Sequence, residues 1–194
     1  MSQEDYNSLL RDFVKAAVAF ERTHGYPAEM LCAQFALESG WGAHPTGRFN
    51  YFGMTYNPRR HSDFTRCATH EELTERGIAA LPEDERSSIT EKVPLPNGKL
   101  RVALTRKFAS YASLDEAIRD KTSLIMQAAR YRKAWEAFRA DMHYETLMKG
   151  VETAGYATGS GYAAALERII HTNTRGVRDL IELARAGKLN GIAV

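Results

Sequence analysis

Apolar residues recur at helical spacing through the N-terminal part of the chain. Between residues 5 and 24 they stand three or four positions apart, and Gly25 follows as a suitable helix terminator. Pro27 favours the start of a second helix, which is predicted to run to Ser39 and to stop at Gly40. One face of this helix carries Leu31, Gln34, Phe35 and, near its end, a single carboxylate, Glu38.

The pattern then changes to one that is typical of loops and strands. Residues 40–64 are rich in Gly, Pro, Asn and Thr, which predicts a loop. Asn97-Gly98 is a strong hairpin signal and apolar residues alternate after it, so residues 88–110 are predicted to form a β-hairpin. We expect residues from about 60 to 110 to form a small inserted β lobe.

Helical spacing returns after the hairpin. Ser113 and Glu116 form a capping box that opens a predicted helix over residues 114–129. Further helices are predicted over residues 131–140, 144–154, 160–171 and 174–186. Helices that flank a small β region indicate the α+β class. We therefore expect a single domain over residues 1–194, with a mainly helical lobe, the β-hairpin lobe and a cleft between them.

Composition and charge limit the classes of molecule that the protein is expected to bind. The 194 residues are 44% apolar and 26% charged, and the net charge is only +2, which gives no electrostatic reason to expect nucleic acid. No stretch approaches the length of apolar sequence that a membrane span needs, so we expect no membrane insertion. The N-terminal residues include Glu4, Asp5 and Asp12 and lack a basic n-region, so we expect synthesis in the cytoplasm without a signal peptide.

Other motifs favour no metal or organic cofactor. Cys32 lies in an apolar helical run and is expected to be buried, while its pairing with Cys67 stays open. The run from His70 to Thr74 begins like a zinc-protease motif, but threonine stands where the second histidine is needed. Residues 159–164, GSGYAA, match a dinucleotide-binding motif only loosely, because no predicted strand precedes them.

Glu38 is the candidate for chemistry because of its position. A carboxylate at the C-terminal end of a helix opposes the helix dipole, and the apolar neighbours Phe35 and Trp41 disfavour its charged form. Both effects favour a carboxyl that keeps its proton near neutrality and acts as a general acid. The glycines around Trp41 let the chain turn sharply beside a bulky substrate. The alternative is a helix-end glutamate that simply faces solvent.

Three ordered motifs resemble a known family. ALESGWG, which ends at Gly42, is followed by Asn50-Tyr51-Phe52-Gly53, and later by Gly155-Tyr156-Ala157-Thr158 with Tyr162 beyond. Together they resemble the glucosaminidase family, glycoside hydrolase family seventy-three, which includes the peptidoglycan hydrolase domain of the flagellar rod protein. The resemblance covers roughly residues 5–172. It implies a lysozyme-like fold and cleavage of the β-1,4 bond between N-acetylglucosamine and N-acetylmuramic acid in peptidoglycan.

The resemblance also implies roles for individual residues. Glu38 matches the family's catalytic acid, and Tyr156 matches a tyrosine that lies near it and can bond the sugar N-acetyl group. Gly159 stands where the family has an aspartate, so any role of that aspartate is lost. The residues expected to contact substrate are Trp41, Asn50, Tyr51, Phe52 and Tyr162, although aromatic side chains such as these also pack in cores.

Glycosidic cleavage usually needs a second carboxyl group. The family places it in the β lobe, and the run FTRCATHEEL puts Glu71 at the matching position. Glu72 is adjacent and would face the other way on a strand. Glu91, on the hairpin arm, is the alternative, and so is a reaction that uses no second carboxylate.

The expected partner is the glycan strand of peptidoglycan, and we expect the protein to act as a monomer in the periplasm or cell wall. Without a signal peptide it would need non-Sec delivery. One route is injection as an antibacterial effector, for example by type VI secretion, with a periplasmic immunity protein that plugs the cleft. Another is release as a phage endolysin. Other functions to be weighed are a muramidase or lytic transglycosylase, and a non-catalytic wall-binding module.

Overall fold

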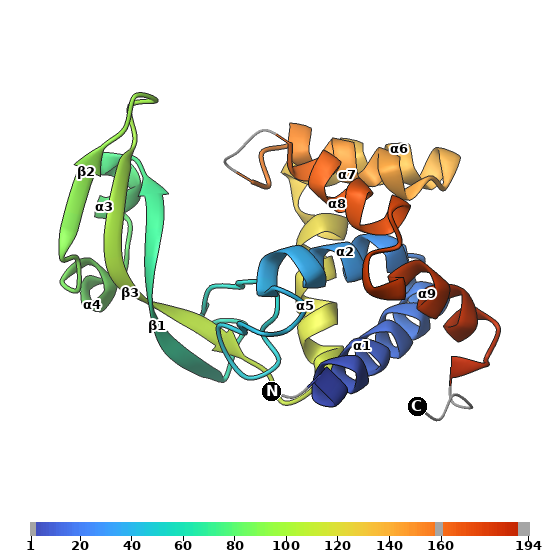
Figure 1. Ribbon diagram of the computed structural model, residues 1–194. Coiled ribbons are helices and arrows are strands. Elements are labelled where there is room, and N and C mark those ends of the chain that lie inside the picture. The colour runs from blue at the N-terminus through green and yellow to red at the C-terminus, as the bar shows by residue number, and fades with distance from the viewer. Residues whose placement is uncertain (1–2, 158–160, 190–194) are drawn as a thin grey trace.

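The structure is a computed structural model, and it describes residues 3–157 and 161–189. Figure 1 shows a helical lobe with a β lobe standing to one side of it. The helical lobe is built from α1 Gln3–His24, α2 Ala28–Ser39, α5 Leu114–Gln127, α6 Arg132–Asp141, α7 Tyr144–Thr153, α8 Tyr162–His171 and α9 Val177–Arg185. Two 3-10 turns, η1 Ala129–Tyr131 and η2 Thr174–Gly176, connect neighbouring helices in this lobe.

The β lobe is an antiparallel sheet with the strand order β1-β3-β2. Its strands are β1 Asp63–Leu73, β2 Glu91–Pro94 and β3 Leu100–Ser110, and two short helices, α3 Glu75–Ala79 and α4 Glu83–Arg86, lie between β1 and β2 along the chain. The lobe has a small apolar core of its own, formed by Ile78, Leu81, Val102 and Leu104. In the upper part of the β lobe as drawn in Figure 1, β1 lies on the side of the helical lobe and β2 on the far side.

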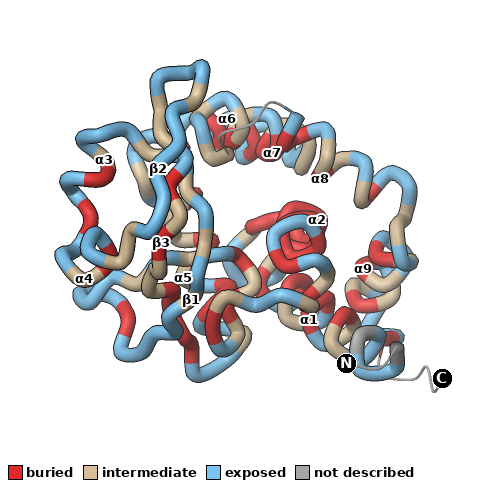
Figure 2. Tube along the Cα trace, turned by 60° about the vertical axis from the view of Figure 1, so that its left-hand side comes forward, coloured by how far each residue is buried: buried red, intermediate tan, exposed pale blue. Residues whose placement is uncertain are grey.

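The main core is centred on α2, which is buried along nearly its whole length (Figure 2). The ring of Phe35 from α2 stacks on that of Phe13 from α1 with centroids 4.0 Å apart, and both side chains are fully buried. Full burial of such a side chain stabilises the fold by about 1.5–3 kcal/mol. Helix α2 is therefore held firmly, and the residues at its end have a fixed position.

The α+β class and the predicted helices are confirmed, with small shifts at the helix ends. The last helix starts later than predicted, at Val177, because residues 174–176 form the separate turn η2. The β lobe contains three strands and not only a hairpin, so the predicted loop over residues 40–64 ends where β1 begins, at Asp63. No residue of β1 is fully buried, and its half-buried positions, Cys67, Thr69, Glu71 and Leu73, include two polar side chains, which explains why the strand lacks an alternating apolar pattern.

The chain passes between the two lobes twice, and both connecting segments contact Asp120 of α5. His61, just before β1, lies with its Nε2 atom 3.1 Å from Oδ2 of Asp120, and Arg60 beside it forms an ion pair with the same carboxylate. Tyr111, just after β3, donates its hydroxyl to Oδ2 of Asp120 at 2.8 Å. One carboxylate thus holds both the entry and the exit of the β lobe against the helical lobe.

The cysteines, the apolar character of the helices and the grouping of possible metal ligands complete the description of the fold. Cys32 is buried as expected, and both it and Cys67 are free thiols. Within residues 3–157 and 161–189, no helix combines the length and the apolar character that a bilayer crossing needs. In the same residues, no group of three or more His, Cys, Asp and Glu side chains is arranged to hold a metal ion.

Candidate active site

The end of α2 is shaped by the residues that follow Glu38. Gly40 adopts a left-handed conformation with φ of 57°, and the next residue, Trp41, does so as well. The hydroxyl of Ser39 donates to the carbonyl of Phe35 at 2.6 Å and accepts from the backbone N–H of Gly42 at 2.8 Å. These contacts end the helix abruptly and leave Glu38 on its last turn.

Gly42 must be a glycine for two separate reasons. Its φ of 84° lies in the region that side chains disfavour. A Cβ atom at this position would also lie 2.5 Å from Cδ2 of Leu9 and 2.9 Å from Cζ of Phe35. The close approach of this turn to α1 and α2 therefore leaves no space for a larger residue.

Glu38 is exposed, and its carboxylate is held by a tyrosine. Tyr162, at the start of α8, donates its hydroxyl to Oε1 of Glu38 at 2.8 Å, and Nε2 of Gln34 donates to the same Tyr162 oxygen at 2.9 Å. The expectation of an apolar, desolvated carboxyl is wrong, because the face of α2 that buries Gln34 and Phe35 turns to solvent at its last turn. The side chain is accessible to a large substrate and has a fixed direction.

A second tyrosine and a buried lysine lie beside this pair. Nζ of Lys121, from α5, donates to the hydroxyl of Tyr156 at 2.6 Å and lies 4.0 Å from the centroid of its ring. The rings of Tyr156 and Tyr162 are 5.3 Å apart, so the two hydrogen-bonded pairs are neighbours. Glu38, Tyr156 and Tyr162, which the sequence motifs predicted as site residues, are therefore brought together.

The charges of this cluster influence one another. Burial lowers the pKa of the Lys121 ammonium to about 7, while the negative charge of Glu38 offsets part of this effect. Burial, followed by the negative charge of Glu38, raises the pKa of the Tyr156 phenol well above its usual range. Burial also raises the pKa of Tyr162, with Tyr156 and Glu38 adding to the effect. Both phenols keep their protons at neutral pH and can act as hydrogen-bond donors.

Lys121 was not predicted from the sequence, although a signal for it exists. Ala117, Lys121 and Ile125 are spaced by four residues on α5, and all three are buried. A lysine that interrupts an apolar stripe at this spacing is placed in the core by the helix itself. Comparison with the three family motifs does not identify Lys121, because its position belongs to none of them.

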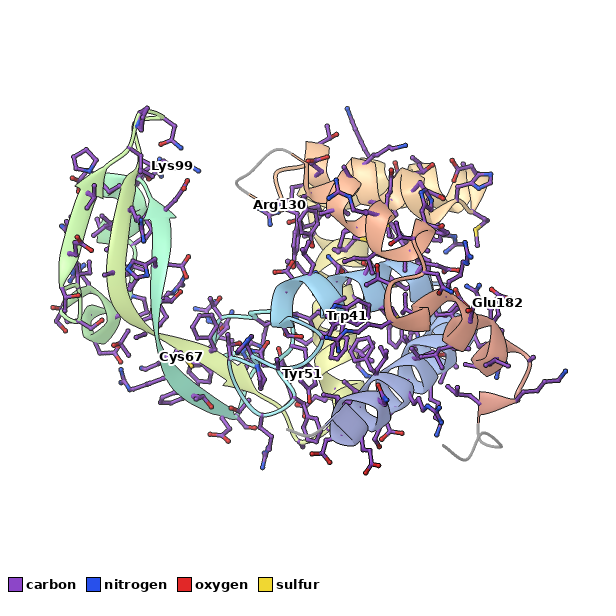
Figure 3. The ribbon with its side chains drawn as sticks, viewed as in Figure 1. Trp41, Tyr51, Cys67, Lys99, Arg130 and Glu182 are labelled. Carbon is purple, nitrogen blue, oxygen red and sulfur yellow. The ribbon has the colours of Figure 1, made fainter. Side chains whose placement is uncertain are left out.

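Trp41 and Tyr51 lie on the side of α2 that faces α1 (Figure 3). The guanidinium of Arg175, in η2, lies 5.4 Å from the centroid of the Trp41 ring. Tyr51 is half-buried, and its ring packs edge-on against Phe35 at 5.1 Å. Both side chains support the end of α2 and keep partly exposed surface, so their contact with substrate stays a prediction.

Asn50 and Phe52 do not fit the predicted role in substrate contact. Asn50 has no exposed surface, and its side-chain amide bonds the carbonyls of Met54 and Ala109, both at 2.8 Å, while its Oδ1 accepts from the N–H of Met54 at 3.0 Å. Phe52 is only 3% exposed and packs against Phe13 with ring centroids 5.9 Å apart. These two residues attach the loop after α2 to β3 and to the core.

The predicted second carboxylates belong to the β lobe and make no contact with the cluster around Glu38 within the residues that the structure covers. Glu71 lies on β1 and is half-buried, with Oε1 3.5 Å from Nη1 of Arg106. Glu91 is exposed on β2, at the opposite edge of the sheet, and Glu72 is exposed on the other face of β1. Thr158, the last residue of the third motif, lies outside the described residues, and so does Gly159.

A helical lobe, a small antiparallel sheet beside it and an exposed glutamate fixed at a helix end together define the class of lysozyme-like glycoside hydrolases. The chain belongs to the glucosaminidase family, whose model, described as mannosyl-glycoprotein endo-beta-N-acetylglucosaminidase, matches residues 14–175. This match confirms the family assignment made from the three motifs.

Curated relatives and solved structures agree with this assignment. The chain is 27% identical over 176 residues to the peptidoglycan hydrolase FlgJ of Salmonella typhimurium, and 26% identical over 172 residues to FlgJ of Escherichia coli. These matches cover 88% and 86% of this chain but only 46% of each relative, so the chain spans about half the length of the relatives.

Two solved structures show the same fold. One is a peptidoglycan hydrolase mutant from Sphingomonas sp. A1, with a TM-score of 0.60, 22% identity, and coverage of 89% of this chain and 98% of that one. The other is the catalytic domain of the autolysin Auto from Listeria monocytogenes, with a TM-score of 0.62, 19% identity, and coverage of 94% and 89%. At these identities the likeness supports the lysozyme-like fold that the sequence predicted.

Proposed function

We propose that the chain hydrolyses peptidoglycan, at the β-1,4 bond between N-acetylglucosamine and N-acetylmuramic acid. The observation that carries this proposal is the exposed carboxyl of Glu38, which the hydroxyl of Tyr162 holds at the end of a buried helix in a member of the glucosaminidase family. The relatives named as peptidoglycan hydrolases support the choice of substrate.

In this proposal Glu38 is the general acid. Its carboxyl protonates the glycosidic oxygen as the bond to the sugar carbon breaks, and positive charge develops on the sugar ring. The hydrogen bond from Tyr162 stabilises the carboxylate that remains. The same carboxylate is then placed to accept a proton from the water molecule that completes hydrolysis.

The path of the glycan follows from the position of α2. Figure 1 shows that α2 ends on the side of the helical lobe that faces the β lobe. A polymer bound beside Glu38 would therefore run between the two lobes. Along this path β1 is the nearest strand of the sheet, which favours Glu71 on β1 over Glu91 on β2 as the second carboxylate.

The main test compares the purified wild type with Glu38→Gln on isolated peptidoglycan. We expect the variant to fold normally, because the side chain is exposed, and to release reducing ends at least about 100-fold more slowly. Glu136→Gln, an exposed substitution on α6, is the matched control and should retain full activity. Full activity of Glu38→Gln would rule out Glu38 as the acid.

Mass spectrometry of the released fragments tests the bond. Reducing N-acetylglucosamine ends are expected. Reducing N-acetylmuramic acid ends would indicate a muramidase, anhydro ends would indicate a transglycosylase, and binding without release would indicate a wall-binding module. Ala variants at Glu71, Glu72 and Glu91 test the second carboxylate, and the proposal for Glu71 fails if only Glu91→Ala loses activity.

The place of action follows from the proposed substrate. We propose that the protein acts in the periplasm or cell wall, because that is where peptidoglycan lies, and that delivery as an antibacterial effector brings it there. A producing cell would then need a periplasmic immunity protein. The position that blocks every mode of substrate binding is between Glu38 and Tyr156, so an inhibitor of that kind would insert a side chain or loop there.

A further inference from the structure

Lys121 is a charged side chain that the mechanism above does not use. It has no exposed surface, and lysine is almost never fully buried unless it is paired. Its ammonium lies against Tyr156 and 5.8 Å from the ring centroid of Phe52. Enclosing a charge in this way destabilises the fold, so the contact with Tyr156 is a reason to look for a role in the site.

We propose that Lys121 is a positioning residue for Tyr156, and that its ammonium donates to the phenol oxygen so that the phenol proton is left for an oxygen atom of the bound sugar. The proposal rests on the proposed function, since it assigns this proton to the substrate of the same site. It concerns a residue outside the three motifs.

The direction of the hydrogen bond carries the argument. An ammonium group has three donors and no acceptor, so the bond of 2.6 Å runs from Nζ of Lys121 to the Tyr156 oxygen. The single phenol proton of Tyr156 must then point away from Lys121. Within the part of the chain that the structure covers, no side chain or carbonyl accepts this proton, whereas a glycan offers many acceptor oxygens.

Tyr162, the neighbouring tyrosine, is held in the same way, and its phenol proton already has an acceptor. Gln34 donates to the oxygen of Tyr162, and the proton of Tyr162 is directed at Glu38. In each pair a donor from the core occupies the phenol oxygen and leaves the phenol proton for the site. Gln34 and Tyr162 orient the acid, and by the same logic Lys121 and Tyr156 orient the substrate beside it.

The arrangement depends on the charge of Lys121. A neutral amine can accept a hydrogen bond, so loss of the ammonium charge lets Tyr156 donate to Nζ and withdraws its proton from the site. Burial brings the pKa of Lys121 to about 7, with Glu38 of α2 acting in the opposite direction. The other titratable or charged groups that act on Tyr156 are Tyr26, Tyr162 of α8, and Arg130 and Tyr131 of η1. Activity should therefore fall as the pH rises through about 7.

The test compares wild type with Lys121→Met, an apolar side chain of similar length, and with Lys121→Gln in case the first variant does not fold. The variants should lower kcat about tenfold or more, with little change in KM, and should lose the alkaline fall in activity near pH 7. The double variant with Tyr156→Phe should be no slower than Tyr156→Phe alone, because both changes remove one interaction. Lys133→Met, at an exposed lysine of α6, is the control.

The proposal is overturned if the Lys121 variants keep the wild-type kcat and pH profile, if the two losses add, or if activity falls only in proportion to folded protein. An NMR titration separates it from the proposed function. The ring signals of Tyr156 should shift near pH 7 in wild type and not in Lys121→Met, whether or not the protein cleaves peptidoglycan. Absence of that shift overturns the role of Lys121, whereas absence of cleavage with the shift present overturns only the proposed function.

Discussion

The Glu38 carboxyl accepts a hydrogen bond from the hydroxyl of Tyr162. Tyr162→Phe removes the donor to Glu38 and leaves the buried Nε2 of Gln34 without its acceptor. We expect kcat on peptidoglycan to fall about tenfold, and the free energy of unfolding to fall by about 1–3 kcal/mol, the cost of an unsatisfied buried donor. Tyr144→Phe, at a half-buried tyrosine of α7, should leave kcat unchanged. An unaltered rate in Tyr162→Phe would mean that Glu38 is oriented by other groups.

The burial of Lys121 predicts how the free energy of unfolding depends on pH, and this prediction is independent of activity. Its pKa is about 7 in the folded chain, below the usual value of 10.5, so the unfolded chain binds one more proton between these pH values. The free energy of unfolding should therefore rise with pH in this window, by up to about 1.4 kcal/mol per pH unit relative to Lys121→Met. Urea unfolding of both proteins at pH 7.5 and pH 9 measures this, and equal pH dependence would contradict the burial of a titrating lysine.

Residues of the candidate site that stand in sequence motifs could be predicted from the sequence, whereas a site residue that is placed there only by the packing of its helix could not. Glu38, Tyr156 and Tyr162 stand in ordered motifs, and they are neighbours in the structure. Lys121 escaped prediction because a lysine in a helix is usually exposed. Asn50 was in a motif but has a structural role, since a motif records that a residue type is needed and does not say whether the need is for chemistry or for folding.

At the scale of elements, the turn after α2 has no space for a side chain at Gly42. Gly42→Ala combines a disfavoured backbone conformation with close contacts to Leu9 and Phe35, whereas Gly25→Ala, before α2, has a similar φ and no neighbour within 4 Å. The backbone effect costs about 1–2 kcal/mol in both. We expect Gly42→Ala to lower the free energy of unfolding by about 1–3 kcal/mol more than Gly25→Ala, because of overpacking. Equal losses in chemical denaturation would show that α1 moves aside easily.

Helices were easier to predict than strands for a physical reason. Apart from α2, which is buried on nearly all sides, the helices of the main lobe bury one face, so their apolar residues recur at helical spacing and the predicted ranges agree with the structure. Strand β1 is mostly exposed and is held by its backbone pairing with β3, which leaves no apolar pattern to detect. The resemblance to the family, and not periodicity, indicated that a carboxylate-bearing strand precedes the hairpin.

For the whole molecule, the proposed place of action gives a test in living cells. If the target is peptidoglycan, the chain should be harmless when it is produced in the cytoplasm of a Gram-negative bacterium and should cause lysis when an export signal is attached. Exported Glu38→Gln should be harmless, because hydrolysis and not binding weakens the wall. Culture turbidity and microscopy measure the outcome. Equal toxicity of the cytoplasmic and exported forms would point to a target other than peptidoglycan.

Two consecutive residues of α5 serve different lobes. Asp120 holds the strands of the β lobe at both crossings, and Lys121 holds Tyr156 beside Glu38. Neighbouring side chains on a helix point roughly 100° apart, so a rotation of α5 changes both sets of contacts at once. An engineer who grafts the β lobe of a relative onto this scaffold must therefore carry α5 with it, or redesign that helix, because the same turn of α5 positions both the β lobe and Tyr156.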